Sequence, residues 1–244
     1  MNETVSIKPF GENAIYVSFG ETIDDTIYSQ IRHFTQQLNR HPFPGMIEYV
    51  PAYTNVTVYY DPIAVLQLKR FSKKELFLHS PFEIASKHIE QLLQHAYEEK
   101  VEEVERIVSI PVVYGGEYGP DLAYVAKHHQ LTEEQVIQMH SERTYRVYML
   151  GFAPGFPFLG GMDERLATPR KATPRLHIEA GSVGIAGAQT GIYPLSTPGG
   201  WQIIGRTPKQ LFLPEQTPPT LLRAGDLIQF QPISEERWEE EVKR

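Results

Sequence analysis

Glycine and proline are concentrated in one segment of this 244-residue sequence, and this limits the available folds more than any other feature. Between Met149 and Pro208 the apolar runs are short, and Gly/Pro turns separate them. Proline removes a backbone hydrogen-bond donor and glycine weakens regular structure, so long helices and central parallel strands are disfavoured. Short strands joined by such turns are typical of a β-barrel or a β-sandwich.

The first hundred residues have a different pattern. Alternating apolar and polar residues predict strands, while apolar residues at helical spacing predict two amphipathic helices. Thr22 or Asp24 is a suitable N-cap for the first helix. The predicted elements are strands at 5–8 and 14–19, a helix at 24–40, strands at 46–53 and 56–60, and a helix at 82–99. This order predicts an α+β fold class with a small N-terminal ββαββα layer.

After a charged segment at 98–106 the pattern changes again. A strand is predicted at 108–114 and a helix at 121–129. Thr132 and Gln135 have the spacing of a capping box, which predicts a further helix to about Glu142. We therefore predict two domains, an N-terminal domain at 1–101 and a second domain at 102–244.

Composition excludes several classes of function. The net charge is −7, which disfavours nucleic acid as a partner, and the absence of cysteine excludes a thiol nucleophile and a thiolate metal site. No His-Glu-x-x-His motif or pair of cysteines is present, so we predict no metal site. No conventional P-loop is present either. No signal-like N-terminus or membrane-length apolar run is found, which predicts a cytoplasmic protein without membrane contact.

Three arginines in the Gly/Pro-rich segment suggest an anion site. Arg170 and Arg175 each follow Thr-Pro, and Arg206 follows Gly205. A guanidinium on a rigid loop can bind a carboxylate or phosphate through two parallel hydrogen bonds. A single such arginine would more simply be a solvated surface residue, but three in one segment favour a pocket lined by main chain. The alternative is a barrel that merely turns many corners.

Other polar residues leave two interpretations open. Gln189 and Tyr193, with Ser182 and Ser196, could bind a small amide or could satisfy turns. His140, at a predicted helix end, could be a general acid or base or could complement the helix dipole. Asp121 could complement a helix N-terminus or hold a cation.

Four motifs in order resemble a known family. These are GFAPGFPFLGG, ATPRKATPR, AGSVGIAGAQTGIYP and TPGGWQIIGRTP, preceded by IPVVYGGEYGPDL. These runs lie between residues 110 and 208, and in this order they resemble the allophanate hydrolase subunit 1 family. The resemblance implies a cyclophilin-like β-barrel domain after the smaller α/β domain. Phe158 stands where tyrosine is common in this family, which weakens any substrate role for that position.

The resemblance also implies a function. It implies a subunit, inactive alone, of an ATP-dependent 5-oxoprolinase that converts 5-oxo-L-proline, ATP and water to L-glutamate, ADP and phosphate. The implied partners are a KipA/PxpC-like subunit and a LamB/YcsF-like PxpA subunit, with ATP and Mg²⁺ bound jointly with the partner subunit. The alternative is a KipI-like inhibitor that binds a sporulation histidine kinase and blocks its autophosphorylation. A homodimer through the N-terminal sheet is a further expectation.

The candidate site residues follow from the motifs. The candidate catalytic residues are His140, Arg170, Arg175 and Arg206. The candidate substrate-binding residues are Gly151, Phe152, Pro154, Gly155, Gly184, Gln189, Tyr193, Gly199 and Gly200. The aromatic residues Phe152, Phe156 and Phe158, with Leu159, could instead anchor a protein partner, although core packing is the simpler role for at least two of them.

Overall fold

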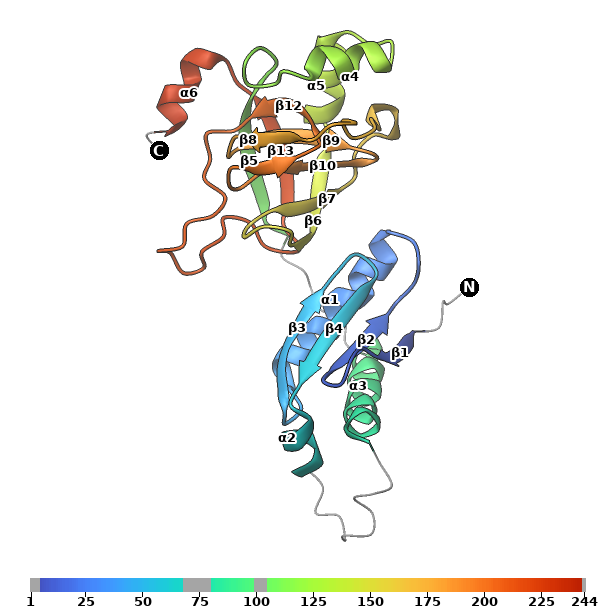
Figure 1. The fold of residues 1–244 in the computed structure, drawn as a ribbon. Helices are drawn as coiled ribbons and strands as arrows, with labels where there is room; N and C mark the ends of the chain where they lie inside the picture. Colours follow the sequence, from blue (N-terminus) through green and yellow to red (C-terminus); the bar gives the residue numbers. More distant parts are fainter. Residues whose placement is uncertain (1–4, 68–79, 99–104, 243–244) are drawn as a thin grey trace. The chain divides into compact units, whose positions relative to one another are not determined.

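The computed structural model describes residues 5–67, 80–98 and 105–242. The chain divides into two compact units, Met1–Glu103 and Val104–Arg244 (Figure 1). The domain boundary predicted between 101 and 102 lies outside the described residues. The α+β fold class, with an α/β layer followed by a β-barrel, is confirmed.

The first unit is a four-stranded antiparallel sheet with strand order β1-β2-β4-β3. Alternate residues of the central strands are buried, so one face of the sheet is covered: Ile15 of β2 pairs with Val58 of β4, and both are fully buried. Helices α1 and α3 pack together over the sheet (Figure 1). The elements are β1 (Ser6–Pro9), β2 (Ala14–Ser18), α1 (Asp25–Arg40), β3 (Met46–Pro51), β4 (Asn55–Tyr60), α2 (Pro62–Gln67) and α3 (Pro81–Glu98).

The start of α1 follows from a single capping residue. The Asp24 side chain accepts a hydrogen bond of 2.9 Å from the Ile27 N–H, so Asp24 is the N-cap and Thr22 is not. The short helix α2 was not predicted. Its signal was Asp61, whose carboxylate accepts from the Ile63 N–H at 2.8 Å, followed by Pro62 at the first helical position.

The second unit is a closed seven-stranded barrel in the order β10-β7-β6-β13-β5-β12-β9, with β9 paired to β10. Strands β5 and β13 are parallel and the other pairs are antiparallel. A separate pair, β8 with β11, lies outside the barrel. The strands are β5 (Ile107–Tyr114), β6 (Thr144–Leu150), β7 (Pro157–Gly160), β8 (Arg175–Ile178), β9 (Ser182–Ala186), β10 (Gln189–Ile192), β11 (Thr197–Gly199), β12 (Gln202–Arg206) and β13 (Leu227–Pro232).

Three helices and one 3₁₀ turn belong to this unit: α4 (Leu122–His128), α5 (Glu133–Ser141), the 3₁₀ turn at Glu164–Leu166, and α6 (Glu235–Val242). The capping box is confirmed, because the Thr132 side chain accepts from the Gln135 N–H and the Gln135 side chain accepts from the Thr132 N–H. Helix α6 was not predicted. No helix in the described ranges is long and apolar enough to cross a membrane.

A substitution at Phe34 tests how much the core of the first unit contributes to stability. The Phe34 side chain is fully buried and packs against Phe19, with ring centroids 5.6 Å apart. Phe34→Ala should lower the free energy of unfolding of this unit by about 3–5 kcal/mol through lost burial and a new cavity. Phe10→Ala is the matched control, because Phe10 is 55% exposed.

Urea unfolding would be followed by two probes. Both tryptophans, Trp201 and Trp238, lie in the second unit, so tryptophan fluorescence monitors the barrel, whereas circular dichroism monitors both units. Phe34→Ala should shift a transition seen by circular dichroism and leave the fluorescence transition in place. An effect no larger than that of Phe10→Ala would contradict the assignment of Phe34 to the core.

Candidate functional site

A pocket of about 300 Å³ opens within the Gly/Pro-rich segment of the barrel unit. The segments that form it are far apart in the chain: the β6–β7 connection, the loop before β8, the end of β10, and β11 with the two residues after it. The lining residues are Phe152, Phe156, Phe158, Arg170, Pro174, Tyr193, Pro198, Gly199, Gly200 and Trp201.

Aromatic rings form one wall of the pocket. The Phe156 ring lies edge-on to the rings of Tyr193 and Trp201, each with centroids 5.6 Å apart, and Tyr193 lies edge-on to Trp201 at 6.2 Å. Edge-to-face pairs of this kind hold one another in fixed orientations. The wall is therefore a rigid apolar surface on which a small planar ring could lie.

Arg170 supplies positive charge to this pocket. Its side chain is exposed and makes no hydrogen bond or ion pair with any residue that the structure describes. Burial raises the pKa of the Tyr193 hydroxyl to about 12, against the opposing effect of the nearby Arg170 and Arg175 charges. Both guanidinium groups thus lie close to the Tyr193 hydroxyl.

Arg175 and Arg206 are already engaged by other groups. Arg175 donates to both Asp121 carboxylate oxygens, at 2.7 and 2.8 Å. Arg206 donates to the Ala180 carbonyl at 2.8 Å and lies over the Trp238 ring. The structure therefore brings Arg170 and Arg175 together near Tyr193, whereas Arg206 contacts other residues and does not line the pocket.

The backbone around Arg170 is fixed on both sides. The Gln202 side chain donates to the Pro169 carbonyl at 2.9 Å, and the Lys171 N–H donates to the Gly200 carbonyl at 2.7 Å. Arg175 pairs with Gly199 in the β8–β11 sheet. These contacts hold the loop that carries Arg170 against Gly199 and Gly200, which line the pocket.

The predicted substrate-binding residues occupy three places. Phe152, Tyr193, Gly199 and Gly200 line the aromatic pocket. Gly151, Pro154 and Gly155 line an open depression of about 360 Å³, which Phe152 also lines. Gly184 and Gln189 lie in β9 and β10, outside the aromatic pocket; a side chain on Gly184 would meet Trp201 at 3.2 Å, so this glycine serves packing.

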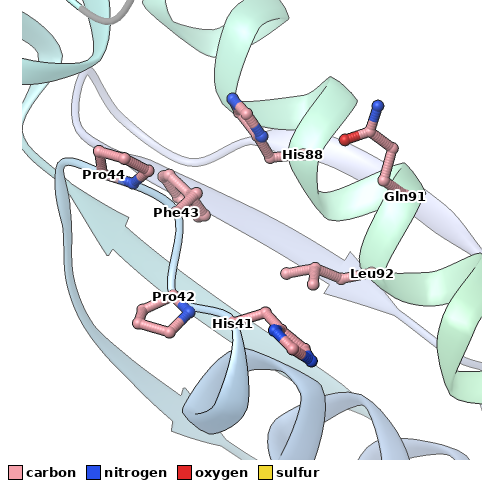
Figure 2. Close-up of a pocket in the computed structure, with 7 residues that line it drawn as sticks. All are labelled: His41, Pro42, Phe43, Pro44, His88, Gln91 and Leu92. Atoms are coloured by element: carbon pink, nitrogen blue, oxygen red, sulfur yellow. The ribbon is translucent and has the colours of Figure 1, made fainter.

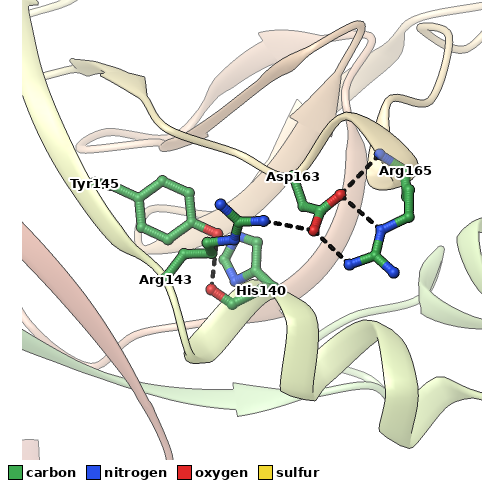
Figure 3. A network of polar contacts seen from close by, with 5 residues as sticks. All are labelled: His140, Arg143, Tyr145, Asp163 and Arg165. Carbon is green, nitrogen blue, oxygen red and sulfur yellow. Dashed lines mark hydrogen bonds and ion pairs between the residues drawn. The ribbon is translucent and has the colours of Figure 1, made fainter.

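His140 lies in the barrel core and away from the pocket lining. It is fully buried, and its neighbours fix its hydrogen bonds. The Thr190 hydroxyl donates to the Gly184 carbonyl at 3.0 Å and so accepts from His140 Nε2 at 2.9 Å, which leaves Nδ1 to accept from the Tyr114 hydroxyl at 2.8 Å. The His140 carbonyl accepts from Tyr145 (Figure 3). Both ring nitrogens of His140 are thus bonded within the protein, and the residue does not line the aromatic pocket; its acid–base role stays a prediction.

Two acidic residues bind arginine side chains. Asp121 is the N-cap residue of α4, but its side chain makes no capping hydrogen bond and binds Arg175 instead. Asp163 accepts hydrogen bonds from Arg143 and Arg165 (Figure 3). Among the described residues, no group of three or more His, Cys, Asp or Glu side chains could hold a metal ion.

Sequence reasoning missed part of the site. Trp201, Pro174 and Pro198 line the pocket but were not predicted as site residues. Of the proposed interface residues, Phe156 and Leu159 are buried in the core at 2% and 1% exposure, while Phe152 is 71% exposed. The signal for Trp201 was its position directly after Gly199-Gly200, where small residues leave space for a ring.

A separate pocket of about 530 Å³ lies in the first unit, between the α1–β3 loop and α3. The Phe43 ring stacks on His88 with centroids 5.7 Å apart (Figure 2). The other lining residues are His41, Pro42, Pro44, Gln91 and Leu92. The described residues of the lining are mainly apolar and include no acidic side chain.

Comparison with known proteins identifies relatives over nearly the whole chain. The family described as carboxyltransferase domain, subdomain C and D, matches residues 5–222. A protein from Bacillus subtilis (strain 168) that is named as a 5-oxoprolinase subunit is 50% identical over 96% of this chain and 95% of its own length. A protein of the same name from Haemophilus influenzae is 44% identical over 93% of this chain and 97% of its own length. These matches confirm the resemblance indicated by the motifs.

A solved structure supports the fold. The crystal structure of TTHA0988 matches with a TM-score of 0.71 and 36% identity. The match covers 91% of this chain and 40% of that one, so this chain spans less than half of the length of TTHA0988.

The buried His140 generates a pH prediction. Burial lowers the pKa of His140 from 6.5 to about 3. Well above pH 6.5 the His140 side chain is neutral in both the folded and the unfolded protein. Below pH 6.5 the unfolded chain binds a proton at His140, whereas the folded chain does not. The stability contributed by the neutral form is therefore lost as pH falls from 6.5 towards 3, by about 2 kcal/mol between pH 6.5 and 5.

Urea unfolding of the wild type and His140→Gln would be compared across this pH range. The variant should lack this part of the pH dependence, whatever its stability at neutral pH. His177→Gln is the control, because the His177 side chain is 62% exposed. Parallel pH dependences for wild type and His140→Gln would show that His140 is protonated in the folded protein.

Proposed function

We propose that this chain, which belongs to the carboxyltransferase domain (subdomain C and D) family, is the 5-oxoproline-binding subunit of a 5-oxoprolinase. Two relatives that match it over nearly their full length are named as 5-oxoprolinase subunits. The assembled enzyme would convert 5-oxo-L-proline, ATP and water to L-glutamate, ADP and phosphate in the cytoplasm. The proposed partners are a KipA/PxpC-like subunit and a LamB/YcsF-like PxpA subunit.

One observation carries the substrate assignment. The pocket combines a rigid aromatic wall with the guanidinium of Arg170, which no described residue binds, on a fixed loop. 5-Oxoproline is a small five-membered lactam with one carboxylate, so its ring could lie on Phe156 and Trp201 while Arg170 binds the carboxylate through charge-assisted hydrogen bonds. The pocket volume of about 300 Å³ suits a ligand of this size.

The same pocket does not fit a nucleoside triphosphate. Among the residues that line it, Arg170 is the one cation. A triphosphate needs several positive charges and backbone N–H donors. We therefore propose that ATP and Mg²⁺ are bound with the partner subunit.

Arg170→Ala tests the assignment. The chain would be combined with its partner subunits, 5-oxoproline and ATP, and glutamate and ADP would be measured. Loss of the charged hydrogen bonds should raise the KM for 5-oxoproline at least about tenfold while leaving thermal stability near that of the wild type. Arg165→Ala is a matched control with the same charge change, because Arg165 is 72% exposed and pairs with Asp163.

Two outcomes would contradict the proposal. No turnover of 5-oxoproline by the properly assembled wild-type subunits would exclude the enzymatic function. Equal KM values for Arg170→Ala and Arg165→Ala would exclude Arg170 as the carboxylate ligand.

A kinase inhibitor is the second candidate function, and the exposure of Phe152 favours it. Phe152 is a non-glycine residue with a φ of 66°, a costly conformation that projects an aromatic ring which is 71% exposed. Exposed aromatic anchors are common in protein interfaces.

Phe152→Ala should abolish binding to a sporulation histidine kinase if that candidate function is correct, as measured by calorimetry. Leu176→Ala is the control, because Leu176 is 91% exposed. Tight kinase binding that survives Phe152→Ala would contradict the role of Phe152.

A further inference from the structure

Asp121 is a nearly buried carboxylate committed to residues distant in sequence. It is 4% exposed and begins α4. Its backbone N–H donates to the Ile203 carbonyl at 2.8 Å, and its carboxylate accepts from the Ile203 N–H at 2.7 Å. Asp121 is therefore fixed to β12 by two hydrogen bonds, independently of the arginine loop.

The same carboxylate holds both ends of the turn at 171–175. Lys171 Nζ lies 3.0 Å from Oδ1, and Arg175 donates to Oδ2 at 2.7 Å and Oδ1 at 2.8 Å. Burial alone would raise the pKa of the Asp121 carboxyl, but hydrogen bonds from Arg175, the Ile203 N–H and Lys171 lower it below its usual value. Asp121 is thus ionised at neutral pH, and its carboxylate is committed to these donors.

Arg170 lies immediately before this clamped turn. Lys171, its neighbour, is held by Asp121 through the side chain and by Gly200 through the backbone. Arg170 itself is unpaired among the described residues. Arg170, Lys171 and Arg175 carry three positive charges against the single Asp121 carboxylate, so the cluster keeps a net positive charge, and Arg170 is its member without a partner among the described residues.

We propose that Asp121 is a positioning residue for the substrate subsite: by clamping Lys171 and Arg175, it holds Arg170 at the pocket and leaves it free for a carboxylate ligand. This inference rests on the proposed 5-oxoproline site. Asp121 acts through Arg170 and does not touch the ligand.

The simpler alternative is that Asp121 only stabilises the fold. Asp226 provides a matched control, because it has the same chemistry elsewhere in the barrel. Asp226 is 2% exposed, accepts two hydrogen bonds from the Arg106 guanidinium, and accepts one from the Arg223 N–H at 2.9 Å. Asp121→Asn and Asp226→Asn each place an amide donor against existing donors, so both should lower the Tm.

The decisive measurement is the KM for 5-oxoproline in the assembled enzyme. Asp121→Asn should raise this KM about tenfold while leaving the KM for ATP unchanged, and Asp226→Asn should change neither. In the Arg170→Ala background, Asp121→Asn should add less than about a twofold further increase, because coupled residues are not additive. Lys171→Met, which removes one contact, should give a smaller increase and serves if Asp121→Asn fails to fold.

Amide hydrogen exchange of the full chain tests the clamp without activity. Asp121→Asn should accelerate exchange of the Lys171 N–H, and Asp226→Asn should not. Unchanged exchange, a KM increase shared by Asp226→Asn, or full additivity with Arg170→Ala would overturn the inference. If the wild-type assembly does not turn over 5-oxoproline, the proposed function is contradicted. The hydrogen-exchange result would still decide whether Asp121 clamps the loop.

Discussion

Close packing of large aromatic rings on glycine backbone is the constraint on which the pocket depends. A side chain on Gly191 would lie 3.0 Å from Phe156 and 3.1 Å from Trp201, and one on Gly199 would lie 2.5 Å from the Tyr193 hydroxyl. The rings occupy space that any other residue would fill. The glycines therefore have a function beyond turning corners: they allow a rigid aromatic wall to form directly against strands β10 and β11.

The local elements of this fold could be predicted from sequence because their signals lie within a few residues. Asp24 and the Thr132–Gln135 capping box mark helix starts, and the alternation around Ile15 marks a strand with one buried face. Helix α2 was missed because its six residues are too few to show helical periodicity, and only the Asp61-Pro62 pair indicated its start. Barrel closure was not predictable in detail, because the β5–β13 pairing joins residues more than a hundred positions apart.

The site shows the same limit. The sequence suggests that Arg170, Arg175 and Arg206 form one anion site, since the three are equivalent as residue types. The structure separates them by their partners: Asp121 binds Arg175, Ala180 binds Arg206, and no described residue binds Arg170. This distinction depends on a contact between Asp121 and Arg175, which are 54 positions apart in the sequence. Likewise, the depth of His140 in the barrel could not be predicted from its place at a helix end.

The ionisable groups of the pocket also explain why such a chain would need partners. Among the residues that line it, the ionisable side chains are those of Arg170 and Tyr193. Burial raises the pKa of the Tyr193 hydroxyl to about 12, so this hydroxyl is not a proton acceptor near neutral pH, and a guanidinium has hydrogen-bond donors but no acceptor. Opening a lactam requires a group that activates water or the leaving nitrogen. A pocket with this lining can bind and orient a carboxylate, and in the proposed reaction the proton transfers must come from groups outside it.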